Sequence, residues 1–98
     1  MASPHIRDNT KLGSLLREFD ERLRLARATE LASCNRLLEA EAMLCQEGVS
    51  QATAAELDLL ARIHIQQGCF KEARRRWERA ISLDEGSREK FEECLRVL

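Results

Sequence analysis

Apolar residues recur at helical spacing in two neighbouring segments near the middle of the chain. The first segment carries Leu57, Leu60, Ala61 and His64 on one stripe, and the second carries Phe70, Ala73, Trp77, Ala80 and Ile81. Residues three or four positions apart share one face of an α-helix, so each segment is predicted to be helical. Small residues alternate with large ones on these stripes, which lets two helix axes approach closely. With Gly68 between them, the segments predict an antiparallel helical hairpin over residues 53–85.

Residues 10–48 carry two further apolar stripes that differ in phase. The first consists of Leu12, Leu15, Leu16, Phe19 and Leu23, and the second contains Leu31, Leu38, Ala42 and Cys45 with Cys34 nearby. Extending the first stripe by heptads from Leu23 leads to Glu30, which is not apolar. The change of phase predicts two helices with a break between about Arg27 and Ser33, the second ending at Gly48. One long helix that bends is the alternative, because no glycine or proline marks the break.

Polar residues mark the other boundaries of these helices. A proline and a polar cluster near the start predict a loose leader over residues 1–8. Thr53 and Glu56 have the spacing of a capping box, in which a hydroxyl and a carboxylate bond backbone N–H groups at the start of a helix. After the hairpin, Ser87 can cap a last amphipathic helix over residues 87–98, which would cover the open side of the hairpin.

The composition is that of one small helical domain. The 98 residues are enough for a single core, so we expect one domain over residues 1–98. Only one proline occurs, tyrosine is absent, and no run of alternating β-branched residues is present, so the predicted class is all-α. Sixteen basic and seventeen acidic residues give a net charge of -1. This balance offers no general attraction for nucleic acid or an anionic membrane, and we expect neither as a partner.

The sequence carries no secretion signal, membrane segment or disulfide pattern. The longest uninterrupted apolar run is Ala42 to Cys45. The four cysteines are widely and irregularly spaced, so we expect reduced thiols in a cytoplasmic protein, unless a signal lies outside this stretch of a longer chain. Cys34, Cys45 and Cys94 are expected to be core residues, whereas Cys69 falls in the hairpin turn and is expected to be exposed.

No group of residues has the spacing of a catalytic or metal-binding site. His64 has no cysteine, histidine or acidic residue three or four positions away, so we expect it to pack in or beside the core. No C-x-x-C pair, nucleophile with an adjacent base or glycine-rich phosphate loop is present. The run Arg74 to Arg76 turns by about 100° per residue, so it predicts a solvated face and not a nucleic-acid stripe. We expect no enzyme activity, no cofactor and no metal.

The hairpin resembles one tetratricopeptide repeat. The pattern L-x-x-L-A-x-x-H is followed by G-x-F-x-x-A-x-x-x-W-x-x-A-I and then L-D, over roughly residues 54–87. Gly68, Phe70, Ala73, Trp77 and Ala80 stand at the family's most characteristic positions, whereas His64 stands where an aromatic is common and Glu85 where proline is common. The resemblance implies a right-handed stack of four to five helices, with a degenerate first pair over residues 10–48, the hairpin over 53–85 and a C-terminal capping helix.

The same resemblance implies a non-catalytic scaffold or adaptor that binds a peptide or helix of a protein partner in a concave groove. It would place Ala55, Asp58, Leu59, Arg62 and Ile65 in that groove. The version of the family that grips acidic chain termini uses lysine and asparagine where this chain has Asp58, Leu59 and Arg62. A partner segment with apolar anchors and a basic residue for Asp58 is therefore favoured. The alternative is a structural unit that forms a homodimer through incompletely capped helical faces.

Overall fold

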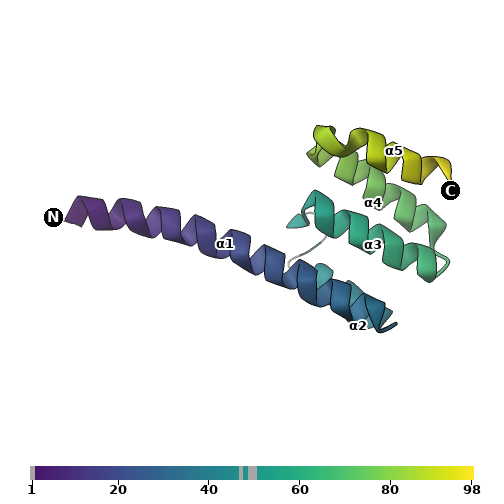
Figure 1. The fold of residues 1–98 in the computed structure, drawn as a ribbon, viewed down its shortest axis with the longest axis horizontal. Coiled ribbons are helices and arrows are strands. Elements are labelled where there is room, and N and C mark those ends of the chain that lie inside the picture. The colour runs from purple at the N-terminus through teal and green to yellow at the C-terminus, as the bar shows by residue number, and fades with distance from the viewer. Residues whose placement is uncertain (1, 47, 49–50) are drawn as a thin grey trace.

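The computed structural model describes residues 2–46, 48 and 51–98. The helices are α1 (Ala2–Ser33), α2 (Leu37–Leu44), α3 (Ala54–Gln66), α4 (Phe70–Leu83) and α5 (Arg88–Arg96), with a short 3-10 helix η2 (Glu85–Ser87) between the last two. The described residues contain no strand, so the predicted all-α class is confirmed. Helices α2 to α5 pack in sequence order, while the N-terminal half of α1 projects away from them (Figure 1).

Helix α1 is much longer than the sequence predicts. Its backbone is helical from Ala2 over 32 residues, in place of the loose leader expected over residues 1–8. Pro4 is compatible with this start, because the first N–H groups of a helix have no intrahelical acceptor and proline lacks that N–H. The first stripe and the region of the predicted break therefore lie on one continuous helix.

The break between the first two helices lies after Ser33, just beyond the predicted interval. The hydroxyls of Thr29 and Ser33 donate to backbone carbonyls four and three residues earlier, at 2.7 and 2.8 Å. Both hydroxyls therefore bond within α1 instead of capping a new helix. The chain turns at Asn35, whose φ of 62° is a left-handed conformation that asparagine adopts more readily than most residues. Helix α2 then ends at Leu44, before the predicted end at Gly48.

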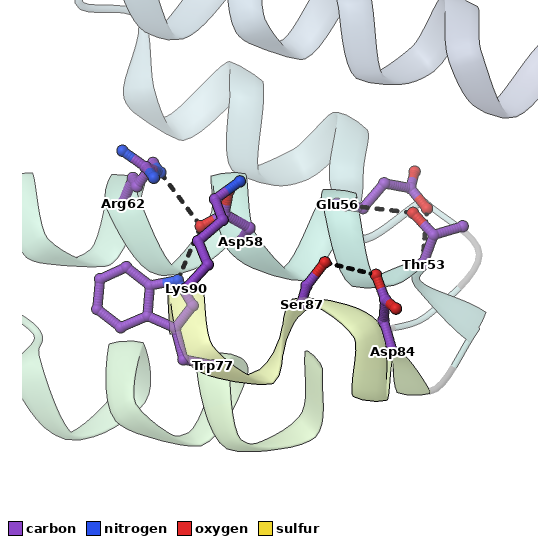
Figure 2. Close-up of polar contacts among 8 residues, drawn as sticks. All are labelled: Thr53, Glu56, Asp58, Arg62, Trp77, Asp84, Ser87 and Lys90. Carbon is purple, nitrogen blue, oxygen red and sulfur yellow. Dashed lines mark hydrogen bonds and ion pairs between the residues drawn. The ribbon is translucent and has the colours of Figure 1, made fainter. Parts of the chain in front are cut away.

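The central hairpin forms as α3 and α4, and its local signals are confirmed. Thr53 Oγ1 accepts a hydrogen bond from Glu56 N–H at 3.2 Å, and Glu56 Oε1 accepts one from Thr53 N–H at 2.9 Å, which completes the capping box (Figure 2). The turn contains Gly68, whose φ of 78° would strain any side chain. The next residue, Cys69, donates its N–H to His64 O at 2.8 Å and closes the end of α3.

Two apolar clusters lie on different sides of α3. The first cluster joins α3 to α4 and α5 and contains Ala52, Leu57, Ala61, Ala73, Trp77, Ala80, Ile81 and Phe91. The second cluster joins α3 to α1 and α2 and contains Ala28, Ala40, Leu44, Leu60 and Ile63. Ala28, Ala40, Ala61 and Ala73 are completely buried, so the helices approach closely at alanine contacts. Helix α3 is therefore the element against which both halves of the fold pack.

Helix α5 covers the hairpin from the side of α4. Phe91 is buried in the first cluster. The η2 turn before α5 is held by Ser87 Oγ, which donates to Asp84 Oδ2 at 2.8 Å (Figure 2). The hydrogen bonds of the Arg88 guanidinium hold the pKa of the Glu85 carboxyl below its usual range. These local contacts orient the last helix so that its apolar side meets the first cluster.

Trp77 is the largest side chain in the first cluster. Its ring is buried, and its Nε1–H donates to Asp58 Oδ1 of α3 at 2.8 Å (Figure 2). Phe70, predicted on the same stripe, is instead exposed at the first position of α4. Trp77 therefore joins α3 and α4 by both apolar packing and one polar contact.

We expect Trp77→Ala to lower the free energy of unfolding by about 3–5 kcal/mol, because a large buried ring is lost. Ala73→Leu should cost about 1–3 kcal/mol, because the added side chain would force α3 and α4 apart. Urea unfolding followed by circular dichroism measures both changes. Phe70→Ala, which removes an exposed ring, is the control and should stay within about 0.5 kcal/mol. Unfolding curves of the first two variants that match the parent would contradict the contact described between α3 and α4.

Candidate partner-binding surface

The five residues predicted to line a groove all lie on α3, but they do not form one open surface. Ala55 and Arg62 are exposed. Leu59 is half-buried against the second cluster, and Ile65 is half-buried against the first. Because the two clusters lie on different sides of α3, these two side chains point to different edges of the helix. The solvent-facing part of the predicted groove is a narrow strip at Ala55 and Arg62.

The fifth groove residue, Asp58, makes contacts within the fold. Its Oδ1 accepts from Trp77 Nε1–H at 2.8 Å and from Arg62 Nε–H at 3.2 Å, and Lys90 Nζ of α5 lies 4.0 Å from Oδ2 (Figure 2). The carboxylate side chain is 16% exposed. A basic residue from a partner would have to compete with these three groups. Trp77 and Lys90 lie on other helices, so spacing in the sequence does not indicate their contacts with Asp58.

Glu56 joins α1 to the start of α3. One of its carboxylate oxygens completes the capping box with Thr53, and the other accepts from Arg24 Nε–H at 2.8 Å. The Glu56 side chain is 1% exposed and the Arg24 side chain 15% exposed, so the pair is largely shielded from water. One carboxylate therefore caps α3 and also holds α1 against it. No spacing rule indicates this pair, because its members lie 32 positions apart.

Five large apolar side chains between residues 12 and 23 of α1 are exposed. They are Leu12 (53% exposed), Leu15 (61%), Leu16 (54%), Phe19 (61%) and Leu23 (39%), and we call them the outer stripe. Single exposed apolar residues are ordinary on a protein surface, whereas a contiguous row is typical of an interaction surface. The sequence predicts an apolar face on this helix. It does not predict that the described part of the fold leaves this face exposed to solvent.

Most of the outer stripe faces away from the rest of the fold, and only Leu23 at its end borders a hollow shared with Met43 of α2. Phe19 belongs to it, and Ala28 is fully buried in the second cluster. These residues are nine positions apart, which is about two and a half turns of an α-helix, so they lie on opposite sides of α1. Leu25 and Leu31 pack against the second cluster together with Ala28. Helix α1 therefore has an inner face that packs on α2 and α3 and an outer face that carries the stripe.

A hollow of about 710 Å³ lies beside α1 and Gln51. It is lined by Gly13, Leu16, Arg17, Asp20, Glu21, Arg24 and Gln51. Charged side chains make up most of this lining, whereas pockets for small molecules are predominantly apolar. The lining is typical of a solvated groove and gives no basis for a small-molecule site.

His64 is buried beside the core, as predicted, and is 5% exposed. Its Nδ1 lies 3.3 Å from Gln67 Oε1 and 3.7 Å from Glu41 Oε1 of α2. Glu41 lies on another helix, far from His64 in the sequence, so helical spacing around His64 does not indicate it. In the part of the chain that the structure describes, no three histidine, cysteine, aspartate or glutamate side chains gather as a metal site.

The run Arg74 to Arg76 is spread around α4, as predicted. Arg74 and Arg75 are exposed, and Arg76 is half-buried. Arg75 and Arg76 lie 3.4 and 3.5 Å from carboxylate oxygens of Glu72. The three guanidinium groups therefore form no continuous basic stripe.

The four cysteines are free thiols, and Cys34 differs from the prediction. Cys69 is exposed in the hairpin turn as predicted, but Cys34 is exposed as well, because the chain turns immediately after α1. Cys45 and Cys94 are half-buried. Burial, with a smaller contribution from the nearby Glu41 carboxylate, raises the pKa of the Cys45 thiol.

We expect Glu56→Ala to lower the free energy of unfolding by about 3 kcal/mol or more, because it removes one buried carboxylate from both Arg24 and the helix cap. Glu56→Gln should cost less, since its amide oxygen can still accept from Thr53 N–H. The control is Glu72→Ala, which breaks two solvent-accessible ion pairs, with Arg75 and Arg76, each worth at most about 1 kcal/mol. Urea denaturation measures all three changes. Equal decreases in the free energy of unfolding for Glu56→Ala and Glu72→Ala would contradict a large contribution of the Glu56–Arg24 pair to stability.

We expect iodoacetamide to modify Cys34 and Cys69 well before Cys45, because burial slows access and a raised pKa leaves less thiolate. Raising the pH should speed the modification of Cys45, because more of its thiol with raised pKa is then ionised. Peptide mass spectrometry of samples quenched over time, from roughly pH 7 to 10, measures these rates. In concentrated urea the rates should converge, which is the control. Equal rates in the folded protein would contradict the burial of Cys45.

Comparisons with known proteins identify no relative of this chain. No family model, curated protein or solved structure matches the chain. None of the helices in the described residues combines the length and the apolar character needed to cross a membrane. The resemblance to a tetratricopeptide repeat therefore depends on the quoted sequence positions alone.

Proposed function

We propose that this chain is a non-catalytic protein-binding module and that the outer stripe is where a helix of a protein partner packs. The observation that carries this proposal is the exposure of five large apolar side chains in one row. Together they expose on the order of 500 Å², near the upper end of the largest apolar patches on monomeric proteins. An amphipathic partner helix removes such a row from water by laying its own apolar face against it.

The charges beside the outer stripe favour a protein partner over nucleic acid or a lipid surface. By helical rotation, Lys11, Glu18 and Arg22 flank one edge of the stripe, and Asp20 and Arg27 flank the other. Each edge therefore carries both signs of charge. Phosphate-rich partners select uniformly basic edges, whereas mixed charges are typical of the edges of helix–helix interfaces.

We infer that α3 and α4 are a tetratricopeptide-like hairpin in a right-handed stack. In this interpretation α1 and α2 are a degenerate first pair, and α5 is a cap. Two observations support it: Ala73, Trp77 and Ala80 stand at family positions and are buried in the first cluster, and α3 has neighbouring helices packed on two sides. Stacked repeats bury a continuous core in this way. Scaffold or adaptor activity without catalysis follows from the same interpretation.

We place the binding surface on α1 and not on the predicted groove of α3. Leu59 and Ile65 already pack into the two clusters, and Asp58 already contacts Trp77 and Lys90. Little apolar surface is left there for a partner. The outer stripe, in contrast, offers large apolar side chains that are 39–61% exposed.

The test compares capture of partners by the immobilised chain and by two variants. Leu16→Glu with Phe19→Glu should weaken capture of a stripe-dependent partner roughly thirtyfold or more, since loss of central apolar anchors costs about 2 kcal/mol or more. Ala55→Glu with Arg62→Glu, on α3, is the matched control and should bind normally. Circular dichroism should show that all three chains are equally helical. Capture that survives in the stripe variant and disappears in the α3 variant would place the site in the predicted groove and overturn this proposal.

A further inference from the structure

We propose that the occupant of the outer stripe is a second copy of this chain, bound antiparallel along α1. This inference depends on the proposed function, because it names the partner of the same surface. Within one copy, the stripe points away from α2 and α3, which pack on the opposite side of α1. The described helices therefore leave the stripe largely uncovered while the second cluster stays intact, and a second copy can supply the cover.

Four of the five residues of the outer stripe form a seam that is complementary to itself in reverse, with Leu15 beside it. Leu12, Leu16, Phe19 and Leu23 are separated by four, three and four positions, and this series is the same in both directions. In an antiparallel pair, Leu12 lies level with Leu23 of the partner subunit, and Leu16 lies level with Phe19 of the partner subunit. Alternation of three and four is also the spacing that keeps a helix seam facing its partner in a coiled coil. Four layers of large apolar side chains are formed, without a polar residue in the seam.

The charges beside the seam favour the antiparallel orientation. Two parallel helices in register would place Arg22 beside Arg27 of the partner subunit, on both sides of the pair by symmetry. Like charges at such positions disfavour association. In the antiparallel register, Arg22 instead lies near Leu15 of the partner subunit, where its methylene stem can cover apolar surface and its charge can stay in water. Asp20 lies near Gly13 of the partner subunit and meets no like charge there.

The size and shape of the molecule allow this pairing. Two stripes bring together on the order of 1,000 Å², which is at the lower limit for a specific protein interface. We therefore expect a reversible dimer with a dissociation constant on the order of micromolar. Because the N-terminal half of α1 projects beyond the other helices (Figure 1), two copies can pair along it while their remaining helices lie at opposite ends of the pair.

Sedimentation equilibrium of the full chain over a concentration series tests the dimer, which mass action should make concentration-dependent. We expect the mass to rise toward twice the chain mass of 11.2 kDa. Phe19→Glu should weaken the dimer roughly thirtyfold or more without loss of helicity. Phe70→Glu is the matched control, because Phe70 of α4 is exposed to a similar degree, and it should dimerise normally. A parent chain that stays monomeric at hundreds of micromolar, or a dimer that survives Phe19→Glu, would overturn the inference.

Disulfide trapping tests the orientation. Leu12→Cys and Leu23→Cys chains, each also carrying Cys34→Ser and Cys69→Ser, are mixed and oxidised, and the linked peptides are identified by mass spectrometry. The antiparallel pair predicts disulfides between Cys at position 12 and Cys at position 23. Two cysteines at position 12 would be about 16 Å apart along the axis, beyond the reach of a disulfide. Predominant links between identical positions would show a parallel pair and overturn the proposed orientation.

The capture experiment separates failure of this inference from failure of the proposed function. A monomeric parent chain whose capture of another protein depends on Leu16 and Phe19 would overturn the second copy as occupant and leave the proposed function standing. A monomeric parent chain with no stripe-dependent capture would overturn both. A dimer that dissociates on Phe19→Glu and not on Phe70→Glu supports both, because the second copy is then the protein that the stripe binds.

Discussion

The position of α1 depends on the buried carboxylate of Glu56, which serves two helices at once. One oxygen satisfies the Thr53 N–H at the start of α3, and the other binds the Arg24 guanidinium of α1. Removing one partner from a buried charge pair is far more costly than removing one from an exposed pair, so this contact, together with the second cluster, helps to fix where α1 meets α3. Arg24 directly follows the last residue of the outer stripe. The link therefore lies at the point where α1 leaves the body of the protein, and it helps to set the direction in which the stripe projects.

Helix α3 transmits this constraint to the rest of the fold, because both apolar clusters pack on it. On one side Leu60 and Ile63 meet α1 and α2, and on the other Leu57 meets α4 and α5. Few of its positions are therefore free for a partner. The same arrangement explains why the groove that a repeat-like hairpin implies offers little exposed apolar surface in this chain. The large exposed apolar side chains lie instead on α1, outside the segment that carries the family resemblance.

The sequence predicts the local features well and the contacts between helices poorly. The capping box, the Gly68 turn and the Trp77 stripe were predictable because each depends on residues a few positions apart, whose helical geometry is known in advance. The partners of Glu56 and Asp58 were not, since Arg24 and Trp77 lie 32 and 19 positions away and only the packed structure brings them together. The same is true of the candidate site. The apolar stripe on α1 was predictable from the sequence because it depends on local spacing, whereas its exposure depends on how the other helices pack.

The change of apolar phase within α1 has a different meaning from the one the sequence suggests. A shift of phase normally indicates that one helix ends and another begins, yet here the helix continues and its apolar side changes from the outer to the inner face. Residues 11–20 are all exposed, so the body of the protein gives this part of α1 little support. Isolated helices of such length are marginal in water and gain most of their stability from packing of an apolar face. Pairing of the outer stripe, as proposed above, would add apolar packing to this part of α1 beyond what its own backbone hydrogen bonds provide.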